Sequence, residues 1–369
     1  MSVFTRIGAA FRGYDWMLTL VAFVLTAIGL AAIYSVDLSR GETLAFFPTQ
    51  SIALAIGLTI SLVAASLHKT RYEASARIIY IGGLLLLIAV LFFGQTIRGT
   101  TGWFRVGPFS FQPAEFAKVA LVLLLGWWVS KQGRRFDRWD FVVSSGIATG
   151  LFVGLILLQP DFGSAFILLV IWLSLLLLVG VKRRHVIVLI CLALGSAVVG
   201  WFFLFEPYQK DRVLTFVHPE RDPLGAGYNV TQSIVAIGAG RLFGRGLGFG
   251  SQSQLHFLPE AQTDFIFAVI GEELGFVGVA VLLLLYVLLL WRLIRIARVC
   301  EDEFSAYTVL GIALLFCIQV IINIGGTIGL LPVTGVPLPF VSYGGSSLIM
   351  AWLLVGIAQS MLHATRRYH

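Results

Sequence analysis

The chain has 369 residues, of which 58% are hydrophobic and only 12% are charged, and its mean hydropathy is +0.91. Soluble domains carry about 25% charged residues, so the composition excludes an ordinary soluble globular protein. The net charge of +7 does not indicate nucleic-acid binding, because the basic residues follow predicted membrane loops. The three cysteines have no Cys-x-x-Cys spacing and indicate neither a disulfide framework nor a zinc site.

Apolar stretches of about 20 residues recur along the whole chain, which is the length needed to cross a bilayer as a helix. Because lipid offers no hydrogen bonds to the backbone, each stretch is predicted to be an α-helix. We predict an all-α polytopic integral membrane protein with about ten transmembrane helices, forming a single domain over residues 1–369. The predicted spans are residues 16–35, 46–67, 77–95, 114–130, 141–159, 163–181, 184–205, 264–291, 305–331 and 342–363.

The first span follows Arg6 and Arg12, as a signal sequence would, but no small-residue cleavage site follows it. We therefore expect it to remain as a membrane helix. Most of the 26 basic residues fall in the predicted loops of one face and near the two chain ends. The short loops of the other face carry only Arg40, Arg98 and Arg105. Since Lys and Arg are enriched in cytoplasmic loops, both termini are predicted to be cytoplasmic.

Two segments of the predicted outer face are unusual. Residues 96–113 are rich in glycine and aromatic residues, among them Trp103. Residues 206–263 form one long extracytoplasmic loop, and a loop of this length usually has a function or is disordered. Its apolar middle, Tyr228–Gly238, is too short to span and is expected to lie at the interface or to re-enter the membrane.

Glu115, Asp161 and Asp264 each lie at the start of a span that runs inward, so all three are predicted at the outer face. Acidic residues favour helix N-termini, where they cap the helix and interact with its dipole. Charged residues in membrane segments are also functional by default. Taken together, we interpret the three carboxylates as one acidic site beneath the long loop.

Lys118 follows Glu115 by three residues and therefore lies on nearly the same helix face. Two interpretations remain open for this lysine. It can pair with Glu115 or extend to the outer interface, as charged residues on helices commonly do. Alternatively, it can bind a phosphate group of a substrate.

The predicted span at 264–291 has 28 residues, which is about 42 Å of helix. Such a helix must tilt or protrude, which puts its first residue at the membrane surface. Further along it, Glu272 and Glu273 are expected to be buried in pairing between helices. Gly271 and Gly275 form a small-residue pair that allows close helix contact.

Residues 331–347 join the last two spans and contain three prolines and a glycine pair, so they are predicted to be irregular. Irregular backbone at membrane depth requires protein or water around it. This segment is therefore either a tight outer hairpin or one wall of an outer cavity. In the second case, Ser342 and Tyr343 would be its hydrogen-bonding groups.

Several of these segments resemble the SEDS family (shape, elongation, division and sporulation proteins). The matching segments are Phe111–Lys118, Gln159–Gly163, Asp222–Tyr228, Phe257–Glu260 with Thr263–Phe267, and Pro337–Ser347. They occur in the family's order and span nearly the full chain. Within the family, Gln252–Leu255 and Val336–Pro339 look more like the RodA branch than the FtsW branch.

The resemblance implies a peptidoglycan glycosyltransferase of the bacterial cytoplasmic (inner) membrane that acts in cell elongation and shape. Its substrate would be lipid II, a disaccharide-pentapeptide on undecaprenyl pyrophosphate. Its partner would be a class B penicillin-binding protein, a transpeptidase that cross-links the new strand. In the family the aspartate that matches Asp264 is essential, and the positions that match Glu115, Lys118 and Asp161 are sensitive.

A polyprenyl pyrophosphate is already an activated donor, so no nucleotide cofactor is required. Asp264 is predicted to be the general base that deprotonates the acceptor sugar hydroxyl, which contributes about 10²–10⁴-fold. The departing pyrophosphate needs positive charge. A divalent cation, Mg²⁺ or Mn²⁺, that bridges Asp264 and the pyrophosphate is left open. The predicted substrate-binding residues are Glu115, Lys118, Asp161, Arg98, Trp103, Arg105, Arg212, Ser342 and Tyr343.

Two other functions fit part of the pattern. A lipid II flippase would also have membrane charges and broken helices, but it should show repeat symmetry with matched broken helices near the midplane. The sequence instead has charges at one face and no evident repeat. A non-catalytic scaffold for the transpeptidase would explain the many spans but not the acidic residues at three helix starts.

Overall fold

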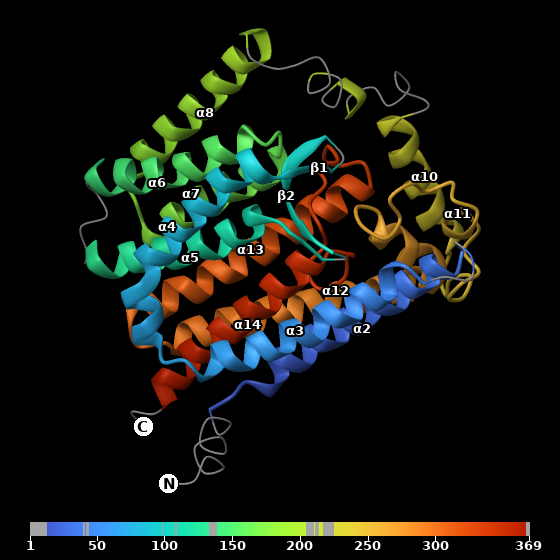
Figure 1. Ribbon diagram of the computed structural model, residues 1–369, viewed down its shortest axis with the longest axis horizontal. Helices are drawn as coiled ribbons and strands as arrows, with labels where there is room; N and C mark the ends of the chain where they lie inside the picture. Colours follow the sequence, from blue (N-terminus) through green and yellow to red (C-terminus); the bar gives the residue numbers. More distant parts are fainter. Residues whose placement is uncertain are drawn as a thin grey trace.

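The computed structural model describes residues 13–39, 41, 44–97, 99–107, 109–132, 139–203, 210, 214–216 and 225–366. Within these residues the chain is a bundle of long α-helices with one small sheet at the same end as α10 (Figure 1). Nine helices in this part of the chain are long and apolar enough to cross a membrane. The predicted all-α polytopic class is therefore confirmed.

The nine helices are α2 (Trp16–Leu38), α3 (Phe46–Ser66), α4 (Lys69–Phe93), α5 (Pro113–Gln132), α6 (Trp139–Leu157), α7 (Phe162–Val179), α12 (Ile266–Val299), α13 (Glu303–Thr327) and α14 (Gly345–Arg366). A further helix, α8 (Arg183–Phe203), lies where the seventh span was predicted. It extends away from the other helices (Figure 1), and it contacts α7 and, through the rings of His185 and Trp139, the start of α6.

Several helices begin at an acidic residue that accepts a backbone N–H of the first turn. Asp15 accepts from the N–H of Leu18 at 2.9 Å and so begins α2. Asp161 begins α7 in the same way, and Asp302 begins α13. Such a cap contributes about 1 kcal/mol and fixes where the helix starts.

Helix α5 lies in the middle of the bundle, in contact with α4, α6, α7, α13 and α14. All of its residues from Pro113 to Gly126 are buried except Phe116. A helix that is buried on every side has no solvent or lipid face. The polar side chains on it must therefore find partners inside the protein.

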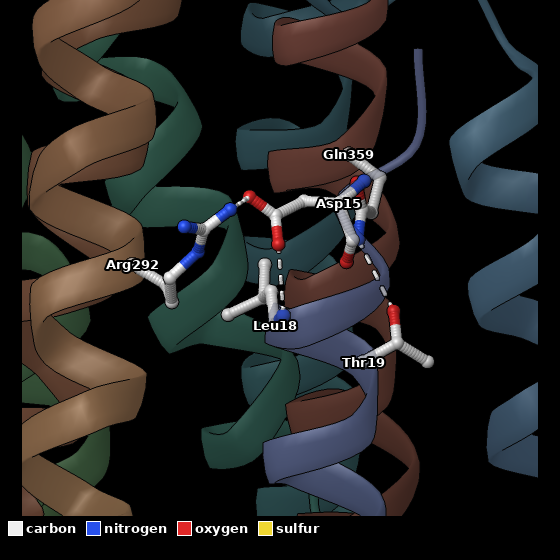
Figure 2. A network of polar contacts seen from close by, with 5 residues as sticks. All are labelled: Asp15, Leu18, Thr19, Arg292 and Gln359. Atoms are coloured by element: carbon white, nitrogen blue, oxygen red, sulfur yellow. Dashed lines mark hydrogen bonds and ion pairs between the residues drawn. The ribbon is translucent and has the colours of Figure 1, made fainter. Parts of the chain in front are cut away.

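Figure 2 shows a polar network that joins α2, α12 and α14. Arg292 of α12 forms an ion pair with Asp15, which is itself buried. The side-chain amide of Gln359, on α14, accepts from the N–H of Asp15 at 2.9 Å and donates to its carbonyl at 2.8 Å. The same amide donates to the hydroxyl of Thr19 at 3.1 Å. These bonds hold one end of the three helices together.

Helix α12 is longer than the predicted span and is broken inside. Gly275 has φ 65° and ψ −164°, which is not helical and which only glycine adopts readily. The helix therefore consists of a short first part that starts at Ile266 and a longer second part after the break. Of the predicted small-residue pair, Gly271 lies close to Ile237 of α10, whereas the atoms nearest to Gly275 belong to the loop at Leu242–Gly244.

The long segment before α12 contains two helices, α10 (Ala226–Ala239) and α11 (Ser251–Gln254). Helix α10 includes the apolar stretch predicted to lie at the interface, and it packs against α12 and α13. Figure 1 places α10 and α11 at the end of the bundle opposite to the end of α14.

The glycine- and aromatic-rich segment forms a three-stranded antiparallel sheet, a feature that we did not predict. Its strands are β1 (Gln95–Ile97), β2 (Thr100–Val106) and β3 (Phe109–Phe111), with β2 in the middle. Trp103 pairs with Gln95, and Phe104 pairs with Phe111. The sheet lies between α4 and α5 in the chain and packs on both helices.

Candidate functional site

A cavity of about 850 Å³ opens at the end of the bundle that carries the sheet and α10. This volume is typical of a ligand-binding pocket. Its walls come from α3, the sheet, the start of α7, α10, the turn before α12, and the irregular segment between α13 and α14. Elements that are far apart in the sequence therefore enclose one space.

The cavity has polar and apolar lining. The polar lining residues include Thr49, Ser110, Gln112, Asp161, Asn229, Thr231, Glu260, Thr263, Asp264, Thr334 and Tyr343. Among the apolar ones, Ile56, Phe216, Ile234 and Ile328 are solvent-exposed. The cavity thus has both polar and exposed apolar walls, which suits a ligand with polar and apolar parts.

Asp264 lines this cavity and lies in the turn that leads into α12. The carbonyl of Asp264 accepts hydrogen bonds from Asn323 at 3.2 Å and from Thr327 at 3.4 Å, both on α13. The irregular segment holds the residues just before it. The hydroxyl of Ser342 donates to the carbonyl of Thr263 at 2.7 Å. These bonds fix the backbone of Asp264 from two sides.

Asp161 lines the same cavity and is held by two hydrogen bonds. One carboxylate oxygen accepts from the N–H of Ser164 at 3.0 Å and caps α7. The other accepts from the side-chain amide of Gln112 at 3.0 Å. Gln112 is in turn fixed because its N–H donates to the hydroxyl of Ser346, on α14, at 3.1 Å. Asp161 therefore has a structural role as a cap and also faces the cavity.

Glu115 and Lys118 do not line this cavity. They form a buried ion pair on α5, with 2.7 Å between the lysine nitrogen and the carboxylate. The pair borders a second cavity of about 10 Å³, together with Gln319 and Ser347. That volume is about enough for one water molecule. Ser347 and Met350 line both cavities, so the two spaces are neighbours.

Of the other predicted site residues, some line the large cavity and some do not. Trp103 and Tyr343 line the large cavity, and the ring of Tyr343 packs edge-on against Phe46 at 4.8 Å between centroids. Ser342 is buried behind the lining, where its hydroxyl accepts from the N–H of Leu338 at 2.9 Å and donates to Thr263. The expectation that Ser342 presents its hydroxyl to the cavity is therefore corrected.

Arg105 lies on β2 with its side chain exposed, and it donates to the carbonyl of Gly107 at 3.4 Å. It is not among the residues that line the cavity. Arg98 and Arg212 lie outside the described residues.

The structure adds polar lining residues that sequence reasoning did not select. Gln112 precedes the proline that begins α5, and Glu260 precedes the turn of Asp264. The carboxylate of Glu260 accepts from the hydroxyl of Thr263 at 3.2 Å. Both lie within segments that carried the family resemblance, which is the signal that pointed to them.

The charged residues among the described lining of the large cavity are Asp161, Glu260 and Asp264, and all three are acidic. The described residues contain no cluster of three or more His, Cys, Asp or Glu that could hold a metal ion on its own. Any cation at this site would therefore need ligands from a bound substrate as well.

The chain is similar to known proteins over nearly its full length. A family model described as "Cell cycle protein", for FtsW, RodA and SpoVE, matches residues 15–367. The chain is 39% identical over 360 residues to the peptidoglycan glycosyltransferase MrdB of Escherichia coli K12, which covers 96% of this chain and 94% of that protein.

A solved structure described as "Structural coordination of polymerization and crosslinking by a peptidoglycan synthase complex" contains a similar chain. It has a TM-score of 0.80 and 35% identity, and the match covers 96% of this chain and 99% of that one. The crystal structure of Thermus thermophilus rod shape determining protein RodA has a TM-score of 0.70 and 33% identity, over 96% of this chain and 98% of that one. The chain belongs to the FtsW, RodA and SpoVE family, that is, the SEDS proteins, and is a multi-pass protein of the bacterial cytoplasmic membrane.

Proposed function

We propose that this protein is a peptidoglycan glycosyltransferase that polymerises lipid II into glycan strands for cell elongation and shape. The observation that carries the proposal is one cavity that is lined by Asp264 and Asp161 and also by exposed apolar side chains. A lipid-linked sugar has a polar head that suits the polar lining and a hydrocarbon tail that suits the apolar lining. The family membership and the activity in the name of its relative MrdB support the same reaction.

The cavity is proposed to open at the outer face of the membrane. Its support is the distribution of Lys and Arg, which are enriched in cytoplasmic loops. Lys69 begins α4 and Lys131 lies in the last turn of α5, whereas the opposite ends of these two helices adjoin the sheet that lines the cavity. This orientation puts both termini in the cytoplasm.

Asp264 is our proposed general base. It would accept the proton of the acceptor sugar hydroxyl while that oxygen forms a bond to the donor sugar carbon. The bond from this carbon to the pyrophosphate oxygen breaks, and undecaprenyl pyrophosphate leaves with the electron pair. The hydrogen bonds from Asn323 and Thr327 to the backbone carbonyl of Asp264 would hold the main chain of this residue in one place, from which its side chain reaches the acceptor. Base catalysis of this kind is worth about 10²–10⁴-fold.

Asp161 is proposed to bind or orient the substrate rather than to take its proton. Both of its oxygens already accept a hydrogen bond, one from Ser164 and one from Gln112. Its two oxygens are thus already engaged in holding the start of α7 and the side chain of Gln112, which suits a positioning role. Gln112, Trp103 and Tyr343 would complete the contacts with the sugar.

The leaving pyrophosphate still requires a positive charge nearby. Lys118 is paired with Glu115 away from the cavity, so we propose it as a support for α5 rather than as a phosphate ligand. Arg98 and Arg212 remain our candidates. A divalent cation, Mg²⁺ or Mn²⁺, would fit the acidic lining, because such ions commonly bind one or two carboxylates plus substrate phosphates. It would supply charge stabilisation for the leaving group.

A class B penicillin-binding protein is the proposed partner. A structurally similar chain occurs in a complex whose description joins polymerisation with cross-linking, which supports such a partner. The chain itself would make the glycan strand, and the transpeptidase would cross-link it.

The test is polymerisation of fluorescent lipid II by purified protein, with and without the partner. Asp264→Asn should lower the rate by about 10²-fold or more, because it removes the base but preserves the shape of the side chain. Glu73→Gln is the control, since Glu73 pairs with Lys131 on the surface and does not line the cavity. Both variants should elute and unfold like the parent protein.

Polymer made at the parent rate by Asp264→Asn would remove Asp264 from the role of base. Movement of lipid II across liposome membranes without any polymer would overturn the enzyme assignment in favour of a flippase. Normal strand synthesis in cells that carry Asp264→Asn would favour a scaffold.

A further inference from the structure

A group of large apolar side chains is exposed on the loop between α10 and α11. Leu242, Phe243, Leu247 and Phe249 are 62%, 81%, 49% and 75% exposed, and we call them the loop patch. Exposed apolar patches on ordered segments mark contacts with protein or with membrane. None of the four lines the large cavity, so the loop patch is not part of the site described above.

The loop that carries the patch is bonded to α12 at its break. The N–H groups of Arg245 and Gly246 donate to the carbonyls of Glu272 and Glu273 at 3.0 and 2.9 Å. On the other side of Gly275, the N–H groups of Phe276 and Val277 donate to the carbonyls of Arg241 and Leu242 at 2.9 and 3.0 Å. The loop thus satisfies the backbone groups that the break in the helix leaves open, which is required near lipid.

Two buried carboxylates of α12 bind the loop and the helix α11 that follows it. The side chain of Glu272 accepts from the N–H groups of Gln252 and Ser253 at 2.8 and 3.1 Å. The side chain of Glu273 accepts from the N–H of Gly248 at 3.2 Å and from the hydroxyl of Ser35, on α2. We expected these acids to be buried in pairing between helices, and both are buried: Glu272 bonds to α11, and Glu273 bonds to α2 and to Gly248 of the loop. The loop is therefore held firmly while its apolar side chains point outward.

The loop patch continues the apolar surface of α12. Phe276 and Val277, which bond to the loop, are exposed, and so are Val281, Leu284 and Val287 further along the same helix. Most of this second part of α12 is apolar and exposed, as expected for a helix that faces lipid. Since the backbone of Leu242 is bonded to that of Val277, the patch lies beside the first turn of this surface.

Two arginines lie beside the loop patch in the chain. Arg241 and Arg245 are both exposed and flank Leu242 and Phe243 in the chain. Arginine beside aromatic and aliphatic side chains is typical of segments that lie at the membrane interface, because the cation reaches the headgroups while the apolar groups enter the acyl region.

We propose that residues 241–249 insert the loop patch into the lipid leaflet on the cavity side of the membrane. The occupant of this surface is the bilayer itself. The loop follows α10 directly, and α10 contributes Asn229, Val230 and Ile234 to the cavity wall. The lipid contact therefore anchors one wall of the cavity at the membrane surface. This inference concerns position in the bilayer and does not depend on the proposed reaction.

The first test measures the depth of the loop by spin labelling in nanodiscs. Cys191, Cys300 and Cys317 are replaced by serine, and a nitroxide is attached to Phe243→Cys or Phe249→Cys. Val287→Cys on α12 is the lipid reference, and Gln95→Cys on the exposed edge of β1 is the water reference. Oxygen concentrates in the acyl region and a nickel chelate in water. The ratio of oxygen to nickel accessibility at the two loop sites should shift from that of Gln95→Cys toward that of Val287→Cys.

The second measurement needs no substitution. The wild-type protein is placed in nanodiscs with a phospholipid that carries a diazirine on its acyl chain, and the labelled peptides are mapped by mass spectrometry. At the level of single residues, label should be found within 241–249 and within the second part of α12, whereas Gln95 itself should carry none.

A loop patch with the accessibility of Gln95→Cys and without lipid labelling would overturn the proposal. The loop patch could instead be exposed to water in the protein without its partner and become protected only when a purified transpeptidase is added. In that case the surface is a protein interface, and the proposal is also wrong. Lipid-like accessibility with the partner absent would support it.

Discussion

The buried ion pair of Glu115 and Lys118 shows what a single residue can contribute in the middle of this bundle. Both side chains are almost fully buried on α5, and the lysine nitrogen lies 2.7 Å from the carboxylate. An unpaired charge in such a place is costly, whereas a buried pair adds little net stability compared with apolar residues. Replacing one of the two residues should therefore lower the stability of the protein more than replacing both with apolar residues.

This mutual dependence gives a prediction for paired substitutions. Lys118→Met or Glu115→Gln alone should destabilise the protein, with Lys118→Met costing about 3–5 kcal/mol because it leaves the carboxylate buried without its cation. The double variant should be more stable than Lys118→Met. Thermal unfolding in detergent, followed by circular dichroism, measures the order of the midpoints.

A double variant that unfolds at or below the midpoint of Lys118→Met would contradict this account. The same variants also separate structure from binding. If Lys118 contacts the pyrophosphate directly, the double variant should lose polymerisation even though its folded fraction is unchanged.

At the scale of elements, the break in α12 decides how the helix and the preceding loop fit together. Gly275 has a conformation that is essentially restricted to glycine, and a Cβ atom there would lie 2.2 Å from the N atom of Gly244. The backbone of the loop occupies the space that a side chain would need. At the break, the backbone of the loop forms the hydrogen bonds that a further turn of helix would otherwise form.

We predict that Gly275→Ala destabilises the protein and detaches the loop. The backbone strain alone costs about 1–3 kcal/mol, and the contact with Gly244 adds to it. Gly82→Ala on α4 is the matched control, because nothing lies within 4 Å of a Cβ atom at that position. In a helix that change should be neutral or stabilise by up to about 1 kcal/mol.

Hydrogen exchange read by mass spectrometry would follow the loop in both variants. Exchange at 241–249 should become faster in Gly275→Ala and stay slow in Gly82→Ala. An unchanged exchange rate in Gly275→Ala would mean that the break is not what holds the loop.

For the whole molecule, ion pairs between helices join the ends that lie away from the cavity. Besides Asp15 and Arg292, Lys69 of α4 pairs with Asp302, the cap of α13, at 2.5 Å. Burial by itself raises the pKa of Asp302. The hydrogen bonds from Lys69 and Ser305 and the charge of Lys69 outweigh that effect, so the pKa is lowered below its ordinary value of 3.8.

The lowered pKa predicts how stability changes in acid. A carboxyl group whose pKa is lower in the folded state stabilises it above the unfolded pKa, and this contribution is lost as the pH falls through the folded pKa. The unfolding midpoint in detergent should therefore fall as the pH drops below about 3.8. Lys69→Met should weaken this dependence, because it removes the charge and one of the hydrogen bonds.

The pair is partly exposed, so the expected effect is small, and it is measured as the difference between the two pH profiles. Arg71→Met, which changes a neighbouring basic residue of α4, is the control. Parallel profiles for the parent and Lys69→Met would show that the pair does not affect stability.

The membrane helices could be predicted from the sequence, whereas the small sheet could not. The helices lay where the apolar stretches predicted them, because the length of a span depends only on its own residues and on the bilayer. The sheet at 95–111 was not predicted, since its strands are short and their pairing depends on partners elsewhere. Asp161 and Asp264 were selected from their places at helix starts, and they line one cavity.

The positions of Glu115 and Lys118 in the sequence could not show whether their side chains face that cavity. Three acidic residues at three helix starts share a level in the membrane, but helix rotation decides which way each side chain points. On α5, Glu115 points toward Gln319 and Ser347 and the small second cavity. The role of Gln112 likewise depends on Asp161 being 49 residues away in the chain but adjacent in space.

By itself, the sequence determined that this protein is a helical membrane protein of the SEDS family with acidic residues at its helix starts, because apolar length and local motifs need no knowledge of packing. Only the tertiary structure decided which acidic residues share a cavity, that α12 breaks at Gly275, and that a loop with outward apolar side chains fills the break. The physical reason is that the partners of buried polar groups lie far along the chain, and only packing of the helices brings them together.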